Sequence, residues 1–291
     1  IKRNTNIYER NGIDIINNTI TQTNYLPLSW TFSSQNVDLS VIKIGRNSIW
    51  INGGSFPNSD KFINTISRYS KNTRILIRGC NKITSNSLKL CGFRNTLFAQ
   101  EAIINLGMKK ELSKKHNRRI KSLLRRGKVR EISFSDQNQK HFEAFLQTTV
   151  HSNEPKLKHL FLDNMGLDTR LFIYEFAPNI WEGAILVSQN SPIKMQGEQF
   201  FRKKNGKNGI MDALVYELSN IFYDEGFNEF SLGEVPFLTK NELYTSWKAK
   251  LINSIGKKIK YAYNYDNLHY FKNKFATHWD DIYICTNKRL L

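Results

Sequence analysis

The sequence predicts a protein of mixed α and β structure, either α/β or α+β, with two lobes of similar size and a basic helix between them. Three observations lead to this prediction. Segments with strand and helix periodicity alternate in both halves of the 291 residues. Hydrophobic residues make up 40% of the chain and aromatic residues 12%, which is enough for a large core and too much for a disordered basic tail. The positive charge is concentrated in one short segment.

The first predicted lobe covers residues 1–108. It contains a β-hairpin over residues 40–52, because apolar and polar residues alternate on both sides of Gly45-Arg46-Asn47. The same patterns predict a helix near 59–70, a strand at 74–78 and a strand at 97–106.

The segment 109–130 carries more than half of the formal net charge of +18, since it holds 11 basic residues and 1 acidic residue. Residues 1–108 hold 13 and 5, and residues 131–291 hold 19 and 19. A helix is predicted, with Ser113 as its N-cap and Gly127 at its end, because Ile120, Leu123 and Leu124 fall at helical spacing. Its other face is cationic.

One interpretation of this helix is an ordinary solvated surface. Like charges three and four residues apart repel one another, however, so a polyanion that neutralises the face is the favoured interpretation. RNA, DNA and anionic lipid are the candidates. The segment contains no aromatic residue that stacks on bases, so we expect contact with phosphates rather than readout of bases.

The second predicted lobe covers residues 131–291, and its strongest signal is the helix Ile210 to Glu225, whose apolar residues share one face. The other predicted helices lie near 137–150, 155–164, 240–253 and 267–274. The predicted strands lie at 129–134, 169–176, 180–188, 193–202, 230–232, 259–265 and 281–286.

A basic, glycine-bearing loop, Phe200 to Gly209, leads from a predicted strand into the helix that begins at Ile210. Backbone N–H groups at such a helix start suit a phosphate or a carboxylate, and a plain polar turn is the competing interpretation. The loop is neither a P-loop nor a dinucleotide-binding fingerprint, which disfavours nucleotide hydrolysis. Asp212 in the first helical turn either complements the helix dipole, or binds a cationic amine or takes part in proton transfer.

Metal and triad chemistry are not indicated. Cys80, Cys91 and Cys285 are odd in number and lack CxxC spacing, so we predict neither a disulfide framework nor a zinc site. The six histidines form no HxxxH pair and no serine triad order. If the protein is an enzyme, we expect a mechanism without a metal or a bound cofactor.

Several motifs together resemble those of one known family, the catalytic domain of lysylphosphatidylglycerol synthases, also called multiple peptide resistance factors. The motifs occur in the family's order, over roughly residues 95–286, with the basic helix after the first of them. They are Phe98 to Leu106 (FAQEAIINL), Asn208 to Asp212 (NGIMD), Phe230 to Pro236 (FSLGEVP) and Tyr263 to Phe275 (YNYDNLHYFKNKF) followed by Trp279 and Tyr283. The first ninety residues match poorly, and Asn52 to Phe56 departs from the family pattern.

This resemblance implies an α+β fold of tandem acetyltransferase-like (GNAT) lobes joined by a positively charged helix. It also implies an enzyme that moves an aminoacyl group from aminoacyl-tRNA to an acceptor hydroxyl, either of a phosphatidylglycerol-type lipid or of a small molecule. An aminoacyl ester is already activated, so positioning and stabilisation of the oxyanion supply much of the catalysis.

The resemblance also assigns roles to residues. Asp212 binds the ammonium group of the amino acid, and Lys272 or Lys274 binds the ester region or the terminal phosphate. The other substrate-binding positions that it implies are Glu101, Arg202, Gly233, Glu234 and Asn264, with Arg202 at the tRNA 3′ end and Glu234 in place of a usually apolar residue. The tRNA-binding residues that it implies are Lys114, Lys115, Arg118, Arg119, Lys121, Arg125 and Arg126.

Two further functions compete with this one. An acyl-CoA-dependent N-acyltransferase would use the loop from Lys203 to Gly209 as a pyrophosphate cradle, although its glycine spacing differs from the usual coenzyme A motif. A non-catalytic binder of nucleic acid or anionic membrane explains the basic helix and leaves the C-terminal motifs unexplained. No window approaches the ~18 apolar residues that span a bilayer, so we expect a cytoplasmic protein in peripheral contact with the inner face of the membrane.

Overall fold

The computed structural model describes residues 41–45, 47–52, 72–108, 110–150, 152, 165–166, 168–236 and 265–288. The helices predicted near 59–70, 155–164 and 240–253 lie outside the described residues. So does the strand predicted at 259–265, except for Tyr265, with which a helix begins.

The chain divides into two compact units, which are described separately. The first consists of residues 1–100 and 280–291, and the second of residues 101–279. Strands β4 (Arg94–Asn105) and β10 (His278–Thr286) each contribute residues to both units. The lobe boundaries at residues 108 and 130 stay a prediction.

The first unit contains the predicted hairpin, formed by β1 (Val41–Gly45) and β2 (Ser48–Asn52). Strand β3 (Arg74–Cys80) runs parallel to β2 and antiparallel to β10, in the strand order β1-β2-β3-β10-β4. These strands confirm the sequence predictions over the residues that the structure describes.

Helix α3 (Lys82–Leu90) was not predicted from the sequence. Its N-cap Asn81 accepts a hydrogen bond from the backbone N–H of Thr84 at 2.8 Å. Among its apolar residues Leu88 is buried, whereas Ile83 and Leu90 are exposed. The apolar residues therefore form no stripe, and the periodicity that signals an amphipathic helix is missing.

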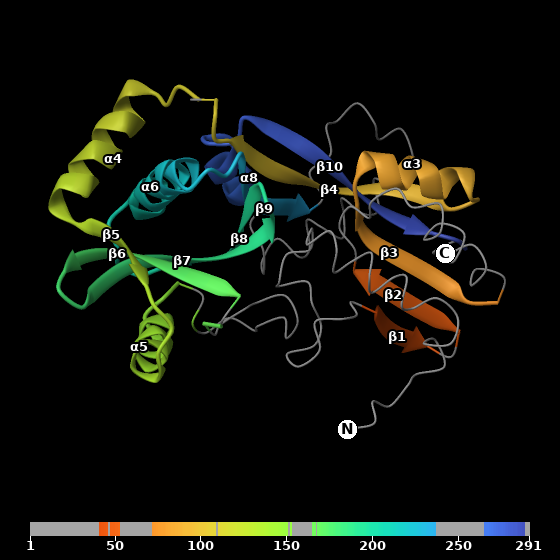
Figure 1. The fold of residues 1–291 in the computed structure, drawn as a ribbon, viewed down its shortest axis with the longest axis horizontal. Coiled ribbons are helices and arrows are strands. Elements are labelled where there is room, and N and C mark those ends of the chain that lie inside the picture. The colour runs from red at the N-terminus through yellow and green to blue at the C-terminus, as the bar shows by residue number, and fades with distance from the viewer. Residues whose placement is uncertain are drawn as a thin grey trace. The chain divides into compact units, whose positions relative to one another are not determined.

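The second unit is built on a mixed sheet with the strand order β4-β9-β8-β7-β6-β5 (Figure 1). Neighbouring strands from β5 to β8 are antiparallel, and β8 and β9 are parallel. The α+β class is confirmed by this sheet. The bounds of its strands are β5 Lys128–Ile132, β6 Thr169–Ala177, β7 Ile180–Ser191, β8 Lys194–Arg202 and β9 Glu229–Pro236.

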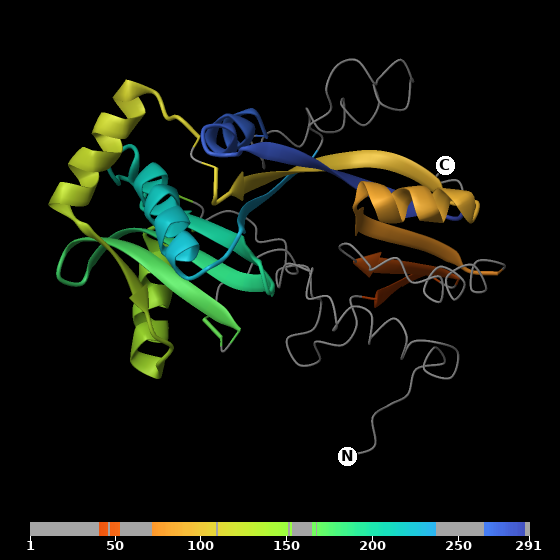
Figure 2. The same cartoon turned by 45° about the horizontal axis from the view of Figure 1, so that its top comes forward.

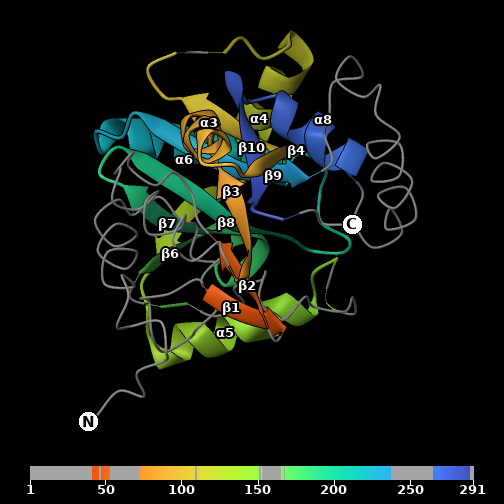
Figure 3. The ribbon, with the colours of Figure 1, turned by 90° about the vertical axis from the view of Figure 1, so that its right-hand side faces the viewer.

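Helices cover both faces of this sheet. Helices α4 (Lys114–Arg126) and α6 (Ile210–Asp224) lie on one face of β5 to β7, and α5 (Asp136–Gln147) lies on the other (Figures 1 and 2). Strand β6 serves both cores, because Phe172 and Tyr174 pack toward α4 and α6 while Leu171 and Ile173 pack toward α5. Helix α8 (Tyr265–Asn273) lies at the opposite end of the unit's sheet from α5, as Figure 3 shows.

The predicted elements that fall on described residues of this unit are present, with shifts at their ends. Helix α4 begins after Ser113, whose hydroxyl accepts from the His116 N–H, and ends at Gly127 as predicted. Helix α5 ends at Gln147 rather than at residue 150, and β9 reaches Pro236 rather than ending at Leu232. The predicted strand 230–232 was shorter than β9, because the glycine and the glutamate that follow the apolar run are typical of a turn.

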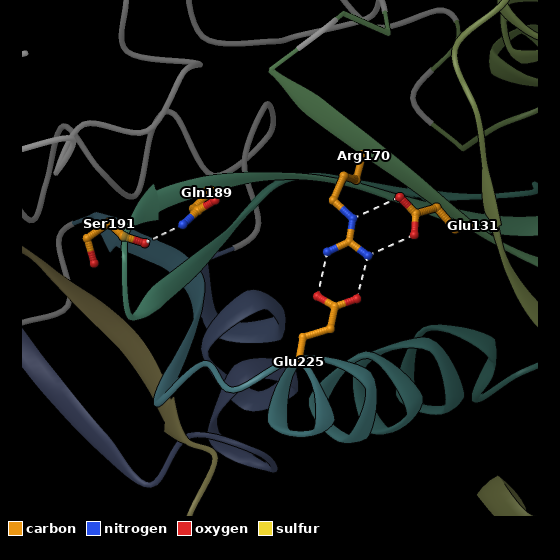
Figure 4. A network of polar contacts seen from close by, with 5 residues as sticks. All are labelled: Glu131, Arg170, Gln189, Ser191 and Glu225. Atoms are coloured by element: carbon orange, nitrogen blue, oxygen red, sulfur yellow. Dashed lines mark hydrogen bonds and ion pairs between the residues drawn. The ribbon is translucent and has the colours of Figure 1, made fainter.

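Arg170 on β6 and two glutamates connect β5, the edge strand of the sheet, to the end of α6 (Figure 4). The Arg170 guanidinium donates to Glu131 on β5 at 2.8 and 2.7 Å and to Glu225, at the end of α6, at 2.6 and 2.6 Å. Bidentate pairs of this kind are stronger than single charged contacts. They raise the pKa of Arg170 above its usual value, with the hydrogen bonds to Glu131 as the largest cause. Nearby, Gln189 donates to the Ser191 carbonyl at 3.2 Å near the end of β7.

The end of α4 is fixed against β6 by a close contact. The Tyr174 hydroxyl donates to the Leu123 carbonyl at 2.7 Å, and the same carbonyl accepts from the Gly127 N–H at 3.0 Å. A Cβ atom at Gly127 would lie 2.6 Å from the Tyr174 ring and 2.7 Å from the Glu175 carbonyl oxygen. Only glycine fits there without displacing backbone.

We therefore predict that Gly127→Ala destabilises the second unit by about 1–3 kcal/mol, the usual cost of overpacking. Thermal or urea unfolding measures this. Gly166→Ala is the matched control, because a Cβ atom at Gly166 would have no neighbour closer than 3.9 Å. Equal stability of the two variants would contradict the prediction.

Candidate functional site

The two parallel strands β8 and β9 pair over three residues and then separate. The pairs are Lys194 with Glu229, Met195 with Phe230 and Gln196 with Ser231. Gly197 follows on β8 and Gly233 on β9, where Gly233 has a φ of 81°. Beyond the last pair, the backbone groups of the two strands need partners other than each other.

Lys272 of α8 supplies one of these partners. Its buried Nζ donates to the Glu234 carbonyl of β9 at 3.0 Å. A Cβ atom at Gly233 would lie 3.4 Å from this Nζ, a tight fit in addition to the strain of a positive φ, so a larger residue there would crowd the amine. Burial lowers the pKa of Lys272 to about 7, against the opposing effects of Glu234 and Glu101.

Two buried amides lie next to the same glycine. A Cβ atom at Gly233 would be 3.6 Å from the Gln196 Nε2, and the Asn190 amide donates to Gln196 Oε1 at 3.4 Å. Both side chains are 2% exposed, and the Asn190 Oδ1 has no hydrogen-bond partner among the described residues. Sequence analysis missed Asn190 and Gln196. A polar residue inside the predicted strand 193–202 was the signal for Gln196, whereas Asn190 falls between two predicted strands, where a polar residue carries no such signal.

Glu101 of β4 contacts both strands near the point where β8 and β9 separate. It accepts from Lys194 Nζ at 3.2 Å to each carboxylate oxygen and from the Ser231 hydroxyl at 2.5 Å. The Ser231 oxygen in turn accepts from the Gly233 N–H at 3.0 Å. Glu101 therefore orients the Ser231 hydroxyl that accepts from the backbone of β9. Lys194 and Ser231 are further residues that the sequence did not indicate.

A partly buried ion pair joins α6 to the residue that follows α8. Lys274 Nζ lies 2.9 Å from Oδ1 and 3.2 Å from Oδ2 of Asp212, which is 4% exposed. The carboxylate sits in the first turn of α6, where the helix dipole also favours a negative charge. The Lys274 ammonium also lies 5.4 Å from the centroid of the Phe271 ring.

The basic helix α4 packs against the N-terminus of α6, close to Asp212. The N-cap of α6 is Gly209, with a φ of 96°, and a Cβ atom there would lie 2.6 Å from Cδ of Arg119. The aliphatic part of Arg119 thus fills the space beside Gly209. All seven predicted tRNA-binding residues of α4 are exposed, and none forms an ion pair with a described residue.

The structure thus brings some predicted site residues together. Asp212 contacts Lys274, and Lys272 lies beside Gly233 and Glu234. Arg202 is exposed at the end of β8, and its described contacts do not reach these groups. Asn264 lies outside the described residues.

Two absences hold for the described part of the chain. No group of three or more His, Cys, Asp or Glu residues there has the arrangement of a metal site. No helix there is long and apolar enough to cross a membrane.

The matched segment of the chain contains most of this geometry. Residues 200–286 match the family described as "Phosphatidylglycerol lysyltransferase, C-terminal". The predicted resemblance is confirmed. Asp212, Gly233, Glu234, Lys272 and Lys274 all fall inside this match.

A curated relative agrees. The phosphatidylglycerol lysyltransferase of Bacillus subtilis is 29% identical over 113 residues, which are 37% of this chain and 13% of that protein. The aligned stretch is therefore a small part of the relative's length.

Solved structures give the same fold. The structure titled L-PGS from Bacillus licheniformis has a TM-score of 0.75 at 16% identity and covers 99% of this chain and 94% of that one. The C-terminal domain of a putative lysylphosphatidylglycerol synthetase from Agrobacterium fabrum has a TM-score of 0.66 at 12% identity, over 85% and 80%. FemX has a TM-score of 0.55 at 9% identity, over 84% and 82%. At these identities the likeness concerns the fold.

The lowered pKa of Lys272 predicts how stability depends on pH. The folded protein loses the Lys272 proton near pH 7, whereas the unfolded chain keeps it up to the usual pKa of 10.5. The unfolded state therefore binds more protons in this window, and the contribution of Lys272 to stability rises as the pH rises from about 7 to 10.5. We predict that Lys272→Met is more stable than the parent at pH 7 and that this advantage shrinks toward pH 10.

Thermal unfolding at a series of pH values measures this effect. Lys140→Met is the control, because Lys140 is exposed on α5. An advantage of Lys272→Met that stays constant from pH 7 to pH 10 would contradict the burial of an ionisable amine.

Proposed function

We propose that the protein transfers an aminoacyl group from aminoacyl-tRNA to a hydroxyl of phosphatidylglycerol. One observation carries the proposal. The buried Lys272 and the Lys274 that pairs with Asp212 are two residues apart in the sequence, and all three residues fall inside the segment that matches the lysyltransferase family. The names of the relatives indicate lysine, so lysyl-tRNA is the first donor to test.

The reaction exchanges one ester for another. The acceptor hydroxyl oxygen forms a bond to the ester carbonyl carbon, and the bond from that carbon to the ribose oxygen of tRNA breaks. The proton of the acceptor hydroxyl ends on the ribose oxygen, so no ATP and no other reactant is consumed. Lys272, with a pKa of about 7, is the group that accepts this proton and returns it, because a base with a pKa near the working pH is most effective.

Asp212 and Lys274 have complementary roles in this proposal. The Asp212 carboxylate binds the α-ammonium group of the amino acid, because a buried carboxylate forms a strong charge-assisted hydrogen bond with a cation. In the free enzyme Lys274 neutralises this carboxylate at 2.9 Å. When the substrate ammonium takes its place, the Lys274 ammonium becomes available to the ester oxygen, where negative charge develops. Three further residues position Lys272 and β9 in this proposal. They are Glu101, Gly233 and Glu234.

The seven basic residues of α4 bind the phosphates of tRNA in this proposal. Their charge is exposed, and Arg119 connects the helix to the N-terminus of α6. Arg202 contacts the tRNA near its 3′ end, and Asn264 belongs to the substrate site. We also propose that the two lobes are tandem acetyltransferase-like lobes joined by α4, and that the protein acts at the cytoplasmic face of the membrane.

Transfer is tested with lysyl-tRNA labelled in the amino acid and with vesicles that contain phosphatidylglycerol. We expect label in the lipid extract. Asp212→Asn should lower kcat/KM for aminoacyl-tRNA by about 10- to 100-fold, the cost of one lost charged contact. Label that moves to a water-soluble product in a cell extract would identify a small-molecule acceptor instead.

Lys272 gives a sharper test of the chemistry. We predict that kcat rises with pH through about 7 as Lys272 loses its proton, and that Lys272→Arg, which stays charged, lowers kcat by about 100-fold or more. Single-turnover transfer between pH 6 and 8 measures this. An unchanged pH profile in Lys272→Arg would assign the proton transfer to another group.

The basic helix is tested by charge reversal. We predict that Arg118→Glu with Arg119→Glu weakens tRNA binding and transfer together, and that the slope of binding against salt falls by about one per residue reversed. Filter binding at several salt concentrations measures this slope. Lys140→Glu on α5 is the control, and equal effects of the two variants would remove α4 from the tRNA site.

The loop before α6 bears on the acyl-CoA alternative. Lys203 pairs with Glu182 at 3.1 Å, and Lys207 lies 4.0 Å from the centroid of the Phe176 ring. Both contacts would have to be exchanged for contacts to a pyrophosphate. Tight binding of acetyl-CoA in calorimetry would favour this alternative over transfer from tRNA.

A further inference from the structure

The hairpin between β6 and β7 has a rigid tip. Ala177 pairs with Ile180, so the turn itself consists of Pro178 and Asn179. Asn179 has a φ of 62°, which an asparagine tolerates at this turn position, and proline fixes the residue before it. The Asn179 N–H donates to Glu175 at 2.8 Å, and Arg130 holds the same carboxylate at 2.8 Å.

This rigid tip presents apolar side chains to solvent. Phe176 is 40% exposed and Ile180 is 47% exposed, one on each side of the turn. Pro178 lies between them. A tip held by hydrogen bonds loses little conformational freedom when these side chains enter an apolar phase.

Cations surround the tip. Lys207 Nζ lies 4.0 Å from the centroid of the Phe176 ring. Lys128 of β5 pairs with Glu175 in the sheet register, and Gly127 at the end of α4 abuts the Glu175 carbonyl. Arg125 and Arg126 therefore end α4 at this edge, and both are exposed. The acidic groups here are already paired, Glu175 with Arg130 and Glu182 with Lys203.

We propose that this hairpin tip docks the protein on an anionic bilayer, with Phe176 and Ile180 in the interface and Lys128 and Lys207 on the lipid phosphates. Apolar side chains framed by cations fit the boundary between acyl chains and headgroups. A nucleic acid would use the cations equally well and could stack a base on Phe176, but it would leave Ile180 and Pro178 in water, whereas a bilayer takes up all three side chains.

The position of the tip is compatible with transfer to a lipid. The role of this docking in catalysis rests on the proposed function. Lys207 lies over Phe176, and only the residues up to Gly209 separate it from the helix that bears Asp212. A Cβ atom at Gly183, near the start of β7, would lie 2.7 Å from Cγ2 of Ile210, so the hairpin packs on the first turn of α6. Docking at the tip would therefore bring the candidate site to the lipid surface.

Vesicle sedimentation tests the proposal without tRNA and without turnover. We compare vesicles of phosphatidylcholine with vesicles that also contain phosphatidylglycerol. The parent protein should bind the anionic vesicles. Phe176→Ser with Ile180→Ser should lower the partition coefficient by roughly tenfold, and Lys128→Gln or Lys207→Gln by about fivefold each.

Phe134→Ser with Ile193→Ser is the matched control, because these two side chains of the same unit are each 50% exposed and lie outside the tip. It should bind vesicles like the parent. Circular dichroism and tRNA binding of the tip variant should also match the parent, which separates docking from folding and from the function of α4.

Three results would overturn the proposal. They are equal vesicle binding by the parent and the tip variant, equal losses in the tip and control variants, and a loss of tRNA binding in the tip variant, which would assign the tip to nucleic acid. Transfer to monomeric short-chain phosphatidylglycerol tests the proposed function separately. If the parent transfers to the short-chain lipid, and the parent and the tip variant bind vesicles equally, the docking inference is wrong and the proposed function stands.

Discussion

The separation of β8 and β9 after three pairs is the constraint on which the candidate site depends. Parallel strands normally satisfy each other's backbone groups, and strands that part leave those groups to other partners. Here the partners are side chains. The Ser231 hydroxyl accepts from the Gly233 N–H, Gln196 donates to the Gly197 carbonyl at 3.2 Å, and Lys272 donates to the Glu234 carbonyl. The buried amine thus has a structural reason to be where it is.

The same constraint explains why the site is rich in buried polar groups. Glu101 fixes Ser231 and pairs with Lys194, while Asp212 pairs with Lys274. A buried charge is costly without a partner, and each of these charged side chains has one. Lys272 is different, because a backbone carbonyl rather than a carboxylate accepts its hydrogen bond, and burial consequently lowers its pKa.

Much of this fold was predictable from the sequence, because apolar periodicity and caps are local. Ser113 and Gly127 marked both ends of α4, and the apolar stripe marked α6. Helix α3 escaped because its apolar residues are not on one face. Motif order named Asp212, Lys272 and Lys274 as candidates, and their roles stay a prediction. The Asp212–Lys274 pair joins residues 62 positions apart, and the Glu101–Ser231 bond spans 130 positions. No local pattern reports such distances, and for that reason Lys194 and Ser231 were missed.

Gly209 has a mechanical consequence. The stem of Arg119 occupies the volume that a side chain at Gly209 would fill, so the surface that carries the positive charge and the first turn of α6 share one van der Waals contact. Any tilt or translation of α4 under the pull of a polyanion reaches Asp212 within three residues, without an intervening loop. If α4 binds the donor as proposed, loading of the donor and alignment of its amino acid are a single displacement rather than two successive events.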